Sequence, residues 1–182
     1  MKTTILFSAF FLCFSSTLTA QDVPTSDNTT NPYSFGVRIG ANLYDITATS
    51  NRTGDTGFFG GLFIERKWSQ NWALQFEANY AGLYTLQFPL ILKYNLGERL
   101  VIYGGAQLDF SLEQQRMDNA FRNKRFGASL LLGAQYNINS KWFLEGRYIH
   151  GLSDQFPIFQ GLGVESIYGK KRSFNFGIGY KF

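Results

Sequence analysis

The sequence predicts an all-β fold, an eight-stranded antiparallel up-and-down transmembrane β-barrel, and three observations favour it. Beyond residue 32, large apolar residues alternate with polar or small ones, as in strands with two unlike faces. Aromatic residues make up 18% of the chain, and 19 glycines against 4 prolines suit curved sheets. The links between the expected strands are short or long, as in outer-membrane barrels with short periplasmic turns and longer outer loops.

The N-terminal residues are interpreted as an export signal. Lys2 precedes an apolar run that ends at Phe14, and a small residue follows at Ala20, which is typical of a secretory signal peptide over 1–20. The polar segment 21–32, "QDVPTSDNTTNP", is expected to be a flexible leader, and the barrel domain to span 33–182. The only cysteine, Cys13, lies in the signal, so we expect a mature chain without disulfides or cysteine metal ligands.

Eight strands are expected, joined by two kinds of link. Their period-2 alternation places them at 33–44, 57–67, 71–81, 85–95, 99–111, 126–138, 141–152 and 171–182. The short links are 69–71, 95–98 and 139–140, with 82–84 short as well, and the longer ones are 45–56, 112–125 and 153–170. Eight antiparallel strands can close on themselves, which removes the unpaired edges that a bilayer does not tolerate.

The first four strands differ in how regular their pattern is. In the first, Val37 and Ile39 flank Arg38, and the second is the least clear because Phe59 and Phe63 fall in phase with Glu65. The third alternates through "WALQFEANY", and the fourth, "LQFPLILKY", has leucine or an aromatic at every second position. The fourth strand therefore gives the firmest register of this half.

The last four strands follow the same rule. The fifth ends in "QLDF", with Asp109 on the polar face, and the sixth, "FGASLLLGAQYNI", separates Leu130 from Gln135 by face. In the seventh, Leu144 belongs to the apolar face and Arg147 to the polar one. The eighth, "FNFGIGYKF", has a large apolar residue at every second position up to the last residue of the chain.

Aromatic residues near the short turns indicate which face looks outward. A soluble lipocalin-type barrel would have the same strands with an apolar lumen, whereas a membrane barrel carries aromatic girdles at the lipid interface. The alternative, that strands simply favour aromatic residues, stays open. The expected girdle consists of Tyr33, Trp68, Trp72, Tyr94, Tyr136, Trp142 and Tyr180.

Charged residues on the polar face are expected to fill the lumen. Eight-stranded barrels are just wide enough for side chains to occupy the interior. Three cations and four acids share this face, so they could pair inside a narrow barrel. This expected lumen charge network comprises Arg38, Glu65, Glu77, Lys93, Asp109, Glu145 and Arg147.

The terminal strand resembles the signal read by the outer-membrane assembly machinery. An extended segment can add to an exposed sheet edge through backbone hydrogen bonds, with alternate side chains entering pockets. We therefore expect the barrel-assembly machinery as a partner during biogenesis. The residues expected to carry this signal are Phe174, Phe176, Ile178, Tyr180 and Phe182.

Two short segments resemble a known family. "FPLILKYNLG" is similar to a "PL-x-x-KY" strand, and "EGRYIHGLSD" to an "RY-x-x-GL-x-D" strand, of the PorT/OmpA-like outer-membrane β-barrel proteins of Bacteroidetes-type bacteria. The "GIGYKF" ending fits the same group. The resemblance implies an eight-stranded barrel in the outer membrane, in a family that often carries no defined molecular activity. The short link at 82–84 departs from the longer loop expected there.

The sequence gives little support for catalysis. Some outer-membrane lipid A deacylases place His and Ser two residues apart, whereas His150 and Ser153 are three apart and would face opposite sides of a continued strand. We expect His150 to be a lipid-interface or rim residue. A single histidine and no mature cysteine offer no metal constellation, so we expect no enzyme, metal or cofactor.

Cations outside the expected strand cores suggest a lipid partner. At the level of lipopolysaccharide phosphates, arginine and lysine are suitable ligands, although a solvated loop is an equally good interpretation. The candidates are Arg116, Arg122, Lys124, Arg125, Lys170, Lys171 and Arg172. Without Lys2 the charges are 16 basic and 13 acidic, too small a surplus to indicate nucleic acid binding.

Three function classes remain at this point. The first is a small outer-membrane barrel with a structural or interaction role through its outer loops, integral to the membrane and in contact with lipid and lipopolysaccharide. The second is a secretion-accessory or narrow transport component, which loss of a secreted cargo in a deletion strain or a measured conductance would reveal. The third is a lipid A-modifying enzyme, testable by lipid A mass analysis.

Overall fold

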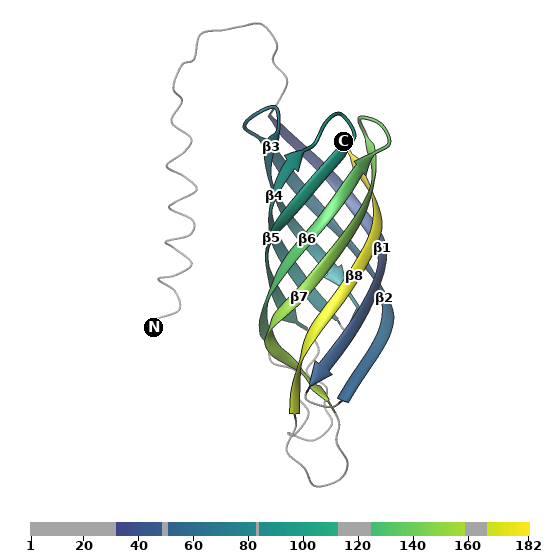
Figure 1. The fold of residues 1–182 in the computed structure, drawn as a ribbon, viewed down its shortest axis with the longest axis vertical. Helices are drawn as coiled ribbons and strands as arrows, with labels where there is room; N and C mark the ends of the chain where they lie inside the picture. The colour runs from purple at the N-terminus through teal and green to yellow at the C-terminus, as the bar shows by residue number, and fades with distance from the viewer. Residues whose placement is uncertain (1–31, 49–50, 83, 113–124, 159–166) are drawn as a thin grey trace, which may run out of the picture. The chain divides into compact units, whose positions relative to one another are not determined.

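The computed structural model is a closed barrel of eight antiparallel strands in chain order, which confirms the predicted fold class (Figure 1). It describes residues 32–48, 51–82, 84–112, 125–158 and 167–182. The strands are β1 (Tyr33–Ala48), β2 (Asn51–Lys67), β3 (Trp72–Ala81), β4 (Thr85–Asn95), β5 (Leu100–Ser111), β6 (Phe126–Asn137), β7 (Trp142–Ile158) and β8 (Ile167–Lys181). The expected signal peptide and the leader up to residue 31 lie outside the described residues. Among the described residues, no helix is long and apolar enough to cross a membrane.

The barrel closes where the last strand pairs with the first. β8 lies between β7 and β1, and its pairing with β1 runs from Gly36–Lys181 to Thr47–Lys170. The backbone amide of Phe182 also donates to the carbonyl of Phe35, at 2.9 Å. Closure leaves neither β1 nor β8 as an edge along this length, as membrane strands require.

Three short turns and the C-terminus share one end of the barrel, here named the turn end (Figure 1, top). The turns 68–71, 96–99 and 138–141 join β2–β3, β4–β5 and β6–β7. The side chain of Asn139 accepts hydrogen bonds from the amides of Lys141 and Trp142, each at 2.8 Å. Gly97 has a φ of 143°, a conformation that costs glycine little and L side chains much.

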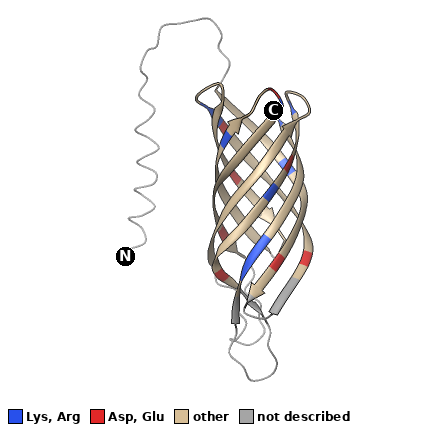
Figure 2. Cartoon of the chain, in the orientation of Figure 1, with Lys and Arg blue, Asp and Glu red and all other residues tan. Residues whose placement is uncertain are grey.

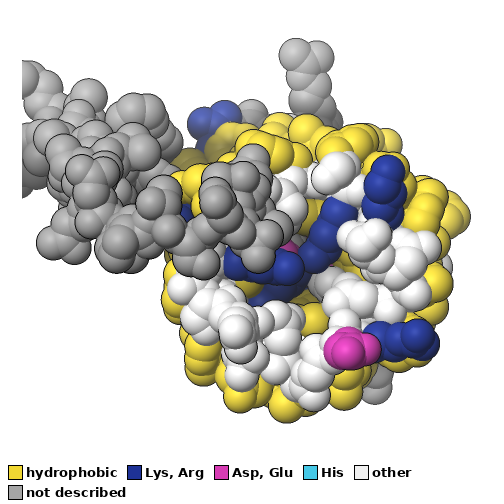
Figure 3. All heavy atoms as spheres, turned by 90° about the horizontal axis from the view of Figure 1, so that it is seen from above, with side chains coloured by type: hydrophobic (Ala, Val, Ile, Leu, Met, Phe, Trp, Pro, Cys, Tyr) yellow, Lys and Arg dark blue, Asp and Glu magenta, His cyan; other side chains and the backbone are white. Residues whose placement is uncertain are grey.

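Alternation separates an apolar outer face from a lumen face. In β4, Leu90 and Leu92 are exposed while Ile91 and Lys93 are buried, and β6 likewise exposes Leu130 and buries Gln135. Figure 3 looks onto the turn end and shows a rim of hydrophobic side chains around the barrel. Contiguous exposure of large apolar side chains on every strand requires a lipid environment.

Two expected links are wrong. Residues 45–56 were expected to form a link, but most of them belong to β1 and β2, whose pairing runs to Ala48–Asn51. The link expected at 153–170 is replaced at both ends by β7 and β8, which pair to Ile158–Ile167 with register shifts between His150 and Phe156. In these extensions the sequence lacks a regular apolar alternation, although inward side chains such as Ile46 and Gln155 are buried, so the ladder continues where the pattern fades. Most of 112–125 lies outside the described residues.

Large side chains inside the barrel lie over glycines of nearby strands. Phe59 and Phe63, which are in phase with Glu65 in β2, point into the lumen and are 4% exposed. The position of a Cβ on Gly179 would meet the ring of Phe143, and one on Gly177 would meet Phe59 at 2.8 Å. Glycines in β8 therefore make room for inward phenyl rings, which fill a lumen of this size.

Candidate functional site

Four charged side chains form a plug at the centre of the lumen. Arg38 of β1 pairs with Glu77 of β3 and with Glu145 of β7, and all three are buried. Arg147 of β7 donates two hydrogen bonds to Glu77, each at 2.8 Å, and lies 3.5 Å from Glu145. Arg38, Glu77, Glu145 and Arg147 are named the plug below. Two guanidinium groups and two carboxylates balance in charge, as buried ions must if burial is not to cost several kcal/mol each.

Neutral side chains add hydrogen bonds to the carboxylates of the plug. Gln75 and Asn79, on either side of Glu77 in β3, donate to its two oxygens at 2.6 and 2.8 Å. The hydroxyl of Tyr103 donates to Glu145 at 3.3 Å and accepts from Nε of Arg147 at 3.4 Å. Figure 2 marks the charged positions along the strands, between the two ends of the barrel. The carboxylates of the plug are thus held by donors from β1, β3, β5 and β7.

A second ion cluster lies nearer the turn end. Lys93 donates to Glu65 at 2.9 Å and to Gln135 at 2.8 Å, and Lys181 donates to Glu65 at 3.2 Å. The Lys93 ammonium is also 5.8 Å from the centre of the Phe63 ring, near the upper limit of a cation–π contact. Lys93, Lys181 and Glu65 are named the turn-end cluster below.

The structure separates Asp109 from the plug. Its carboxylate accepts hydrogen bonds from Ser129 at 2.6 Å and from Gln107 at 2.7 Å. The cation that acts on it electrostatically is Lys171, which is buried and has its ammonium 5.6 Å from the Tyr44 ring centre. The seven expected lumen charges therefore lie in three groups instead of a single network.

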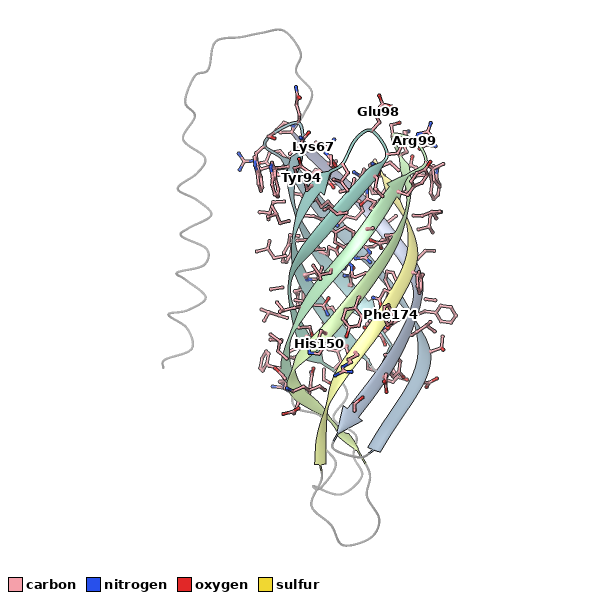
Figure 4. The ribbon with its side chains drawn as sticks, viewed as in Figure 1. Lys67, Tyr94, Glu98, Arg99, His150 and Phe174 are labelled. Carbon is pink, nitrogen blue, oxygen red and sulfur yellow. The ribbon has the colours of Figure 1, made fainter. Side chains whose placement is uncertain are left out.

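The expected girdle residues gather at the turn end in pairs. Trp72 packs edge-on against Tyr94 and Trp142 against Tyr180, each pair with ring centres 4.8 Å apart. The other three, Tyr33, Trp68 and Tyr136, are exposed. Figure 4 labels Tyr94 at this end.

Cations accompany several of these rings. The Arg66 guanidinium lies 5.5 Å from the Tyr33 ring centre, and the Lys141 ammonium lies 5.9 Å from that of Tyr180. Arg99, in the turn before β5, donates to the Tyr136 hydroxyl at 3.3 Å. Rings with an apolar body and a cation beside them suit the boundary between lipid and headgroups.

The residues expected to form the assembly signal all belong to the outer face of β8 or its end. Phe174, Phe176 and Phe182 are exposed, and Tyr180 contacts the rings of both Trp142 and Phe182. Ile178 stands opposite Ile39 of β1 and Leu144 of β7.

Of the cations expected to contact lipopolysaccharide, the four that the structure describes do not lie together in a loop. Arg116, Arg122 and Lys124 lie outside the described residues. Lys170, Lys171 and Arg172 belong to β8, and the expectation for Lys171 is corrected because strand alternation turns it into the lumen. Lys170 and Arg172 are exposed on the outer face, and Arg125 lies beside the outward Phe110 ring at 5.7 Å.

His150 is a half-buried residue on the outer face of β7. Its Nδ1 is 3.4 Å from the Tyr148 hydroxyl, and it stands opposite Arg172 in the ladder. Figure 4 places it toward the end of the barrel away from Glu98 and Arg99, near Phe174. Glu145 faces the lumen, so it does not share a face with His150. Within the described ranges, no group of three or more His, Cys, Asp or Glu side chains could hold a metal ion.

Sequence reasoning missed several lumen residues. Lys181 and Lys171 alternate with the apolar residues of the last strand, so extending the strand pattern inward would have identified both. Gln75, Asn79 and Tyr103 share the polar face of their strands. No sequence signal says which charges across the barrel meet, because that depends on strand register.

Comparison with known proteins agrees with this geometry. Neisserial surface protein A superposes with a TM-score of 0.51 at 16% identity, covering 81% of this chain and 97% of that one. Ail of Yersinia pestis, solved in complex with the heparin analogue sucrose octasulfate, gives 0.50 at 13% identity, covering 82% and 99%. A de novo designed transmembrane β-barrel gives 0.50 at 15% identity, covering 84% and 98%. No curated protein sequence matches the chain significantly.

These structures are similar in fold alone, because their sequence identities are low. The family comparison is more specific: a model described as outer membrane protein beta-barrel domain matches residues 8–182. The lipid-suited outer face and the closed ladder agree with that match. The chain is therefore an integral protein of the outer membrane and belongs to the outer membrane protein beta-barrel domain family.

Proposed function

We propose that this protein is a closed outer-membrane barrel with a structural or interaction role and no catalytic activity. It acts through the partners that bind its outer end, which is the end opposite the turn end. The observation that carries the proposal is the plug. Arg38, Glu77, Glu145 and Arg147 join β1, β3 and β7 across the lumen, and each is at most 6% exposed. A function by contact fits a barrel whose interior is occupied by its own side chains.

The plug opposes passage of solutes for an energetic reason. A solute crossing the lumen would have to part buried ions whose charges would then lack partners. Separating a buried pair costs about 3–5 kcal/mol, and the plug contains several pairs that share groups. Large side chains such as Phe59, Phe63 and Phe143 occupy further lumen space. This favours the interaction role over the narrow transport alternative.

Planar-bilayer recording tests the closed lumen. We expect no stepwise current from the purified wild-type protein, since a continuous water path would require the plug to open. A porin inserted under the same conditions serves as the positive control. Reproducible unitary steps that follow the amount of folded protein would contradict the proposal and favour the transport alternative.

Lipopolysaccharide is the partner that we propose for the outer end. The short turns of outer-membrane barrels face the periplasm, so the other end meets the outer leaflet. Arg125, Lys170 and Arg172 present cations there, although Asp45 and Asp154 stand opposite Arg172 and Lys170 in the ladder. Arginine and lysine can bind the phosphates of lipopolysaccharide in charge-assisted contacts.

Charge reversal tests this partner. The double variant Arg125→Glu/Arg172→Glu should co-purify with several-fold less lipopolysaccharide than wild type, measured by mass spectrometry per folded barrel. Lys141→Glu is the matched control, because Lys141 is exposed at the turn end and faces the other leaflet. Equal lipopolysaccharide in wild type and the double variant would rule out these residues as the contact.

We also propose that the chain belongs to the PorT/OmpA-like branch and carries a cleaved signal over 1–20. The two segments that resemble that branch contribute Lys93 to the turn-end cluster and Arg147 to the plug. These two motif residues therefore form ion pairs inside the barrel. This supports an architecture shared with that branch and does not assign a secretion role. Mass determination of the mature protein should give an N-terminus at Gln21.

A further inference from the structure

The turn end of the lumen carries one positive charge more than its carboxylate balances. In the plug, two arginines face two glutamates, and farther from the turn end Lys171 and Asp109 interact electrostatically. Near the turns, Lys93 and Lys181 share the single carboxylate of Glu65. Among the described lumen side chains, the charge surplus therefore lies in the turn-end cluster.

This surplus lies in a poorly solvated place. Lys93 is 3% and Glu65 2% exposed, and the Lys181 side chain is 17% exposed. Water screens a charge least where it is excluded, so an unbalanced cation there attracts an anion more strongly than a surface lysine does. Exposure of Lys181 indicates the side from which an anion can reach the cluster.

A pocket adjoins the cluster and is lined by groups that suit a carboxylate. Its volume is about 100 Å³, and its lining includes Lys67, Lys93, Lys181 and the amide side chains of Asn95, Gln135 and Asn137. Glu98 is the second acid on its lining, and it is an exposed turn residue. Figure 3 shows Lys and Arg side chains within the central hollow of this end, and Figure 4 labels Lys67 and Glu98 there.

We propose that this periplasmic pocket binds a carboxylate group. Ammonium and amide N–H groups are donors, and the charge of one carboxylate matches the surplus of the cluster. The small volume fits the group itself, so a larger ligand would insert its carboxylate and leave the rest in the periplasm. The source is either a free small acid or the terminus of a peptide.

Titration of the folded, detergent-solubilised protein distinguishes these sources. The probes are acetate, N-acetyl-trialanine with a free C-terminus, and the same peptide as its C-terminal amide, at constant ionic strength. The readout is the NMR shift of the Gln135 and Asn137 side-chain amides. We expect saturable shifts with the free-acid peptide and none with the amide. Saturation with acetate alone assigns a free small acid, and absence of saturation with both acids overturns the proposal.

Two variants change the charge surplus in opposite directions. Lys181→Gln removes it and should weaken binding about tenfold, whereas Glu65→Gln doubles it and should tighten binding about tenfold. Lys141→Gln is the matched control, because it removes a cation from the outside of the same end. A general effect of net charge predicts equal weakening by Lys141→Gln and Lys181→Gln, which would overturn the proposal.

Folding of each variant is checked by heat-modifiable gel migration. If Lys181→Gln does not fold, Lys67→Gln replaces it, since Lys67 is exposed on the pocket lining and is not one of the buried ions. Lys67→Gln should weaken binding several-fold, and unchanged affinity would count against the site. The proposal is independent of the lipopolysaccharide contact, because each concerns a different end of the barrel.

Discussion

Glu77 is the residue on which both arginines of the plug converge. It is fully buried, pairs with Arg38 and accepts two hydrogen bonds from Arg147. Glu145 alone would then face two guanidinium groups if Glu77 were lost. A buried ion without a partner is costly, so the stability of the barrel should be unusually sensitive at this position.

We expect Glu77→Ala to lower the free energy of unfolding by about 3–5 kcal/mol. Urea unfolding in lipid vesicles, followed by tryptophan fluorescence, measures the change. Glu98→Ala is the control, since Glu98 is exposed in a turn and its loss should stay within about 0.5 kcal/mol. Equal effects of the two substitutions would mean that the plug contributes no more than a surface charge.

At the scale of a strand, β8 combines three tasks on its two faces. Its outer face carries Phe174, Phe176 and Tyr180, and its inner face carries glycines at 177 and 179 beneath phenyl rings. The same inner face ends in Lys181 of the turn-end cluster. The regular alternation of the last residues therefore serves lipid contact, lumen packing and charge pairing at once.

The terminal strand should matter more for assembly in the cell than for stability. We expect Tyr180→Ala/Phe182→Ala to reduce the heat-modifiable, folded protein in the outer membrane several-fold, because the extended segment offered to the assembly machinery loses its side chains. Trp72→Ala/Tyr94→Ala is the matched control, as it removes a similar aromatic pair at the same end from other strands. Refolding of the purified chains into vesicles should be similar for the two variants. An equal loss of folded protein from the outer membrane of cells in both variants would contradict the role of Tyr180 and Phe182 as an assembly signal.

Strand existence was predictable, but the lengths of four strands were not. In β1, β2, β7 and β8 the paired backbone extends beyond the expected ends, into segments such as "DITA" and "DTG" that lack an apolar face. A regular alternating pattern identifies a strand, and these extensions lack one even though inward side chains such as Gln155 are buried. Lys171 was assigned both to the start of the expected eighth strand and to the outer-loop cations, and the alternation of that strand already places it on the inner face.

At the scale of the whole molecule, the fold followed from alternation and the outward face from the aromatic residues near the short turns, whereas the grouping of lumen charges followed from neither. Arg38 and Glu77 are 39 residues apart, and Arg147 and Glu77 are 70 apart. Their meeting depends on the stagger of every intervening strand, and a shift of one residue would turn each side chain to the other face. The sequence identifies most of the charged lumen residues, although not Lys181, and the strand register decides which of them meet.

The pairing of β1 with β8 also determines when the barrel can close. Gly36 precedes its partner Lys181 by 145 residues along the chain, so the ring of hydrogen bonds can be completed only after the whole barrel segment has been synthesised. Contacts so distant along the chain form slowly. Until β8 reaches the membrane, therefore, the polypeptide has to be kept from aggregating as an open chain, and quality control can act on it during that time.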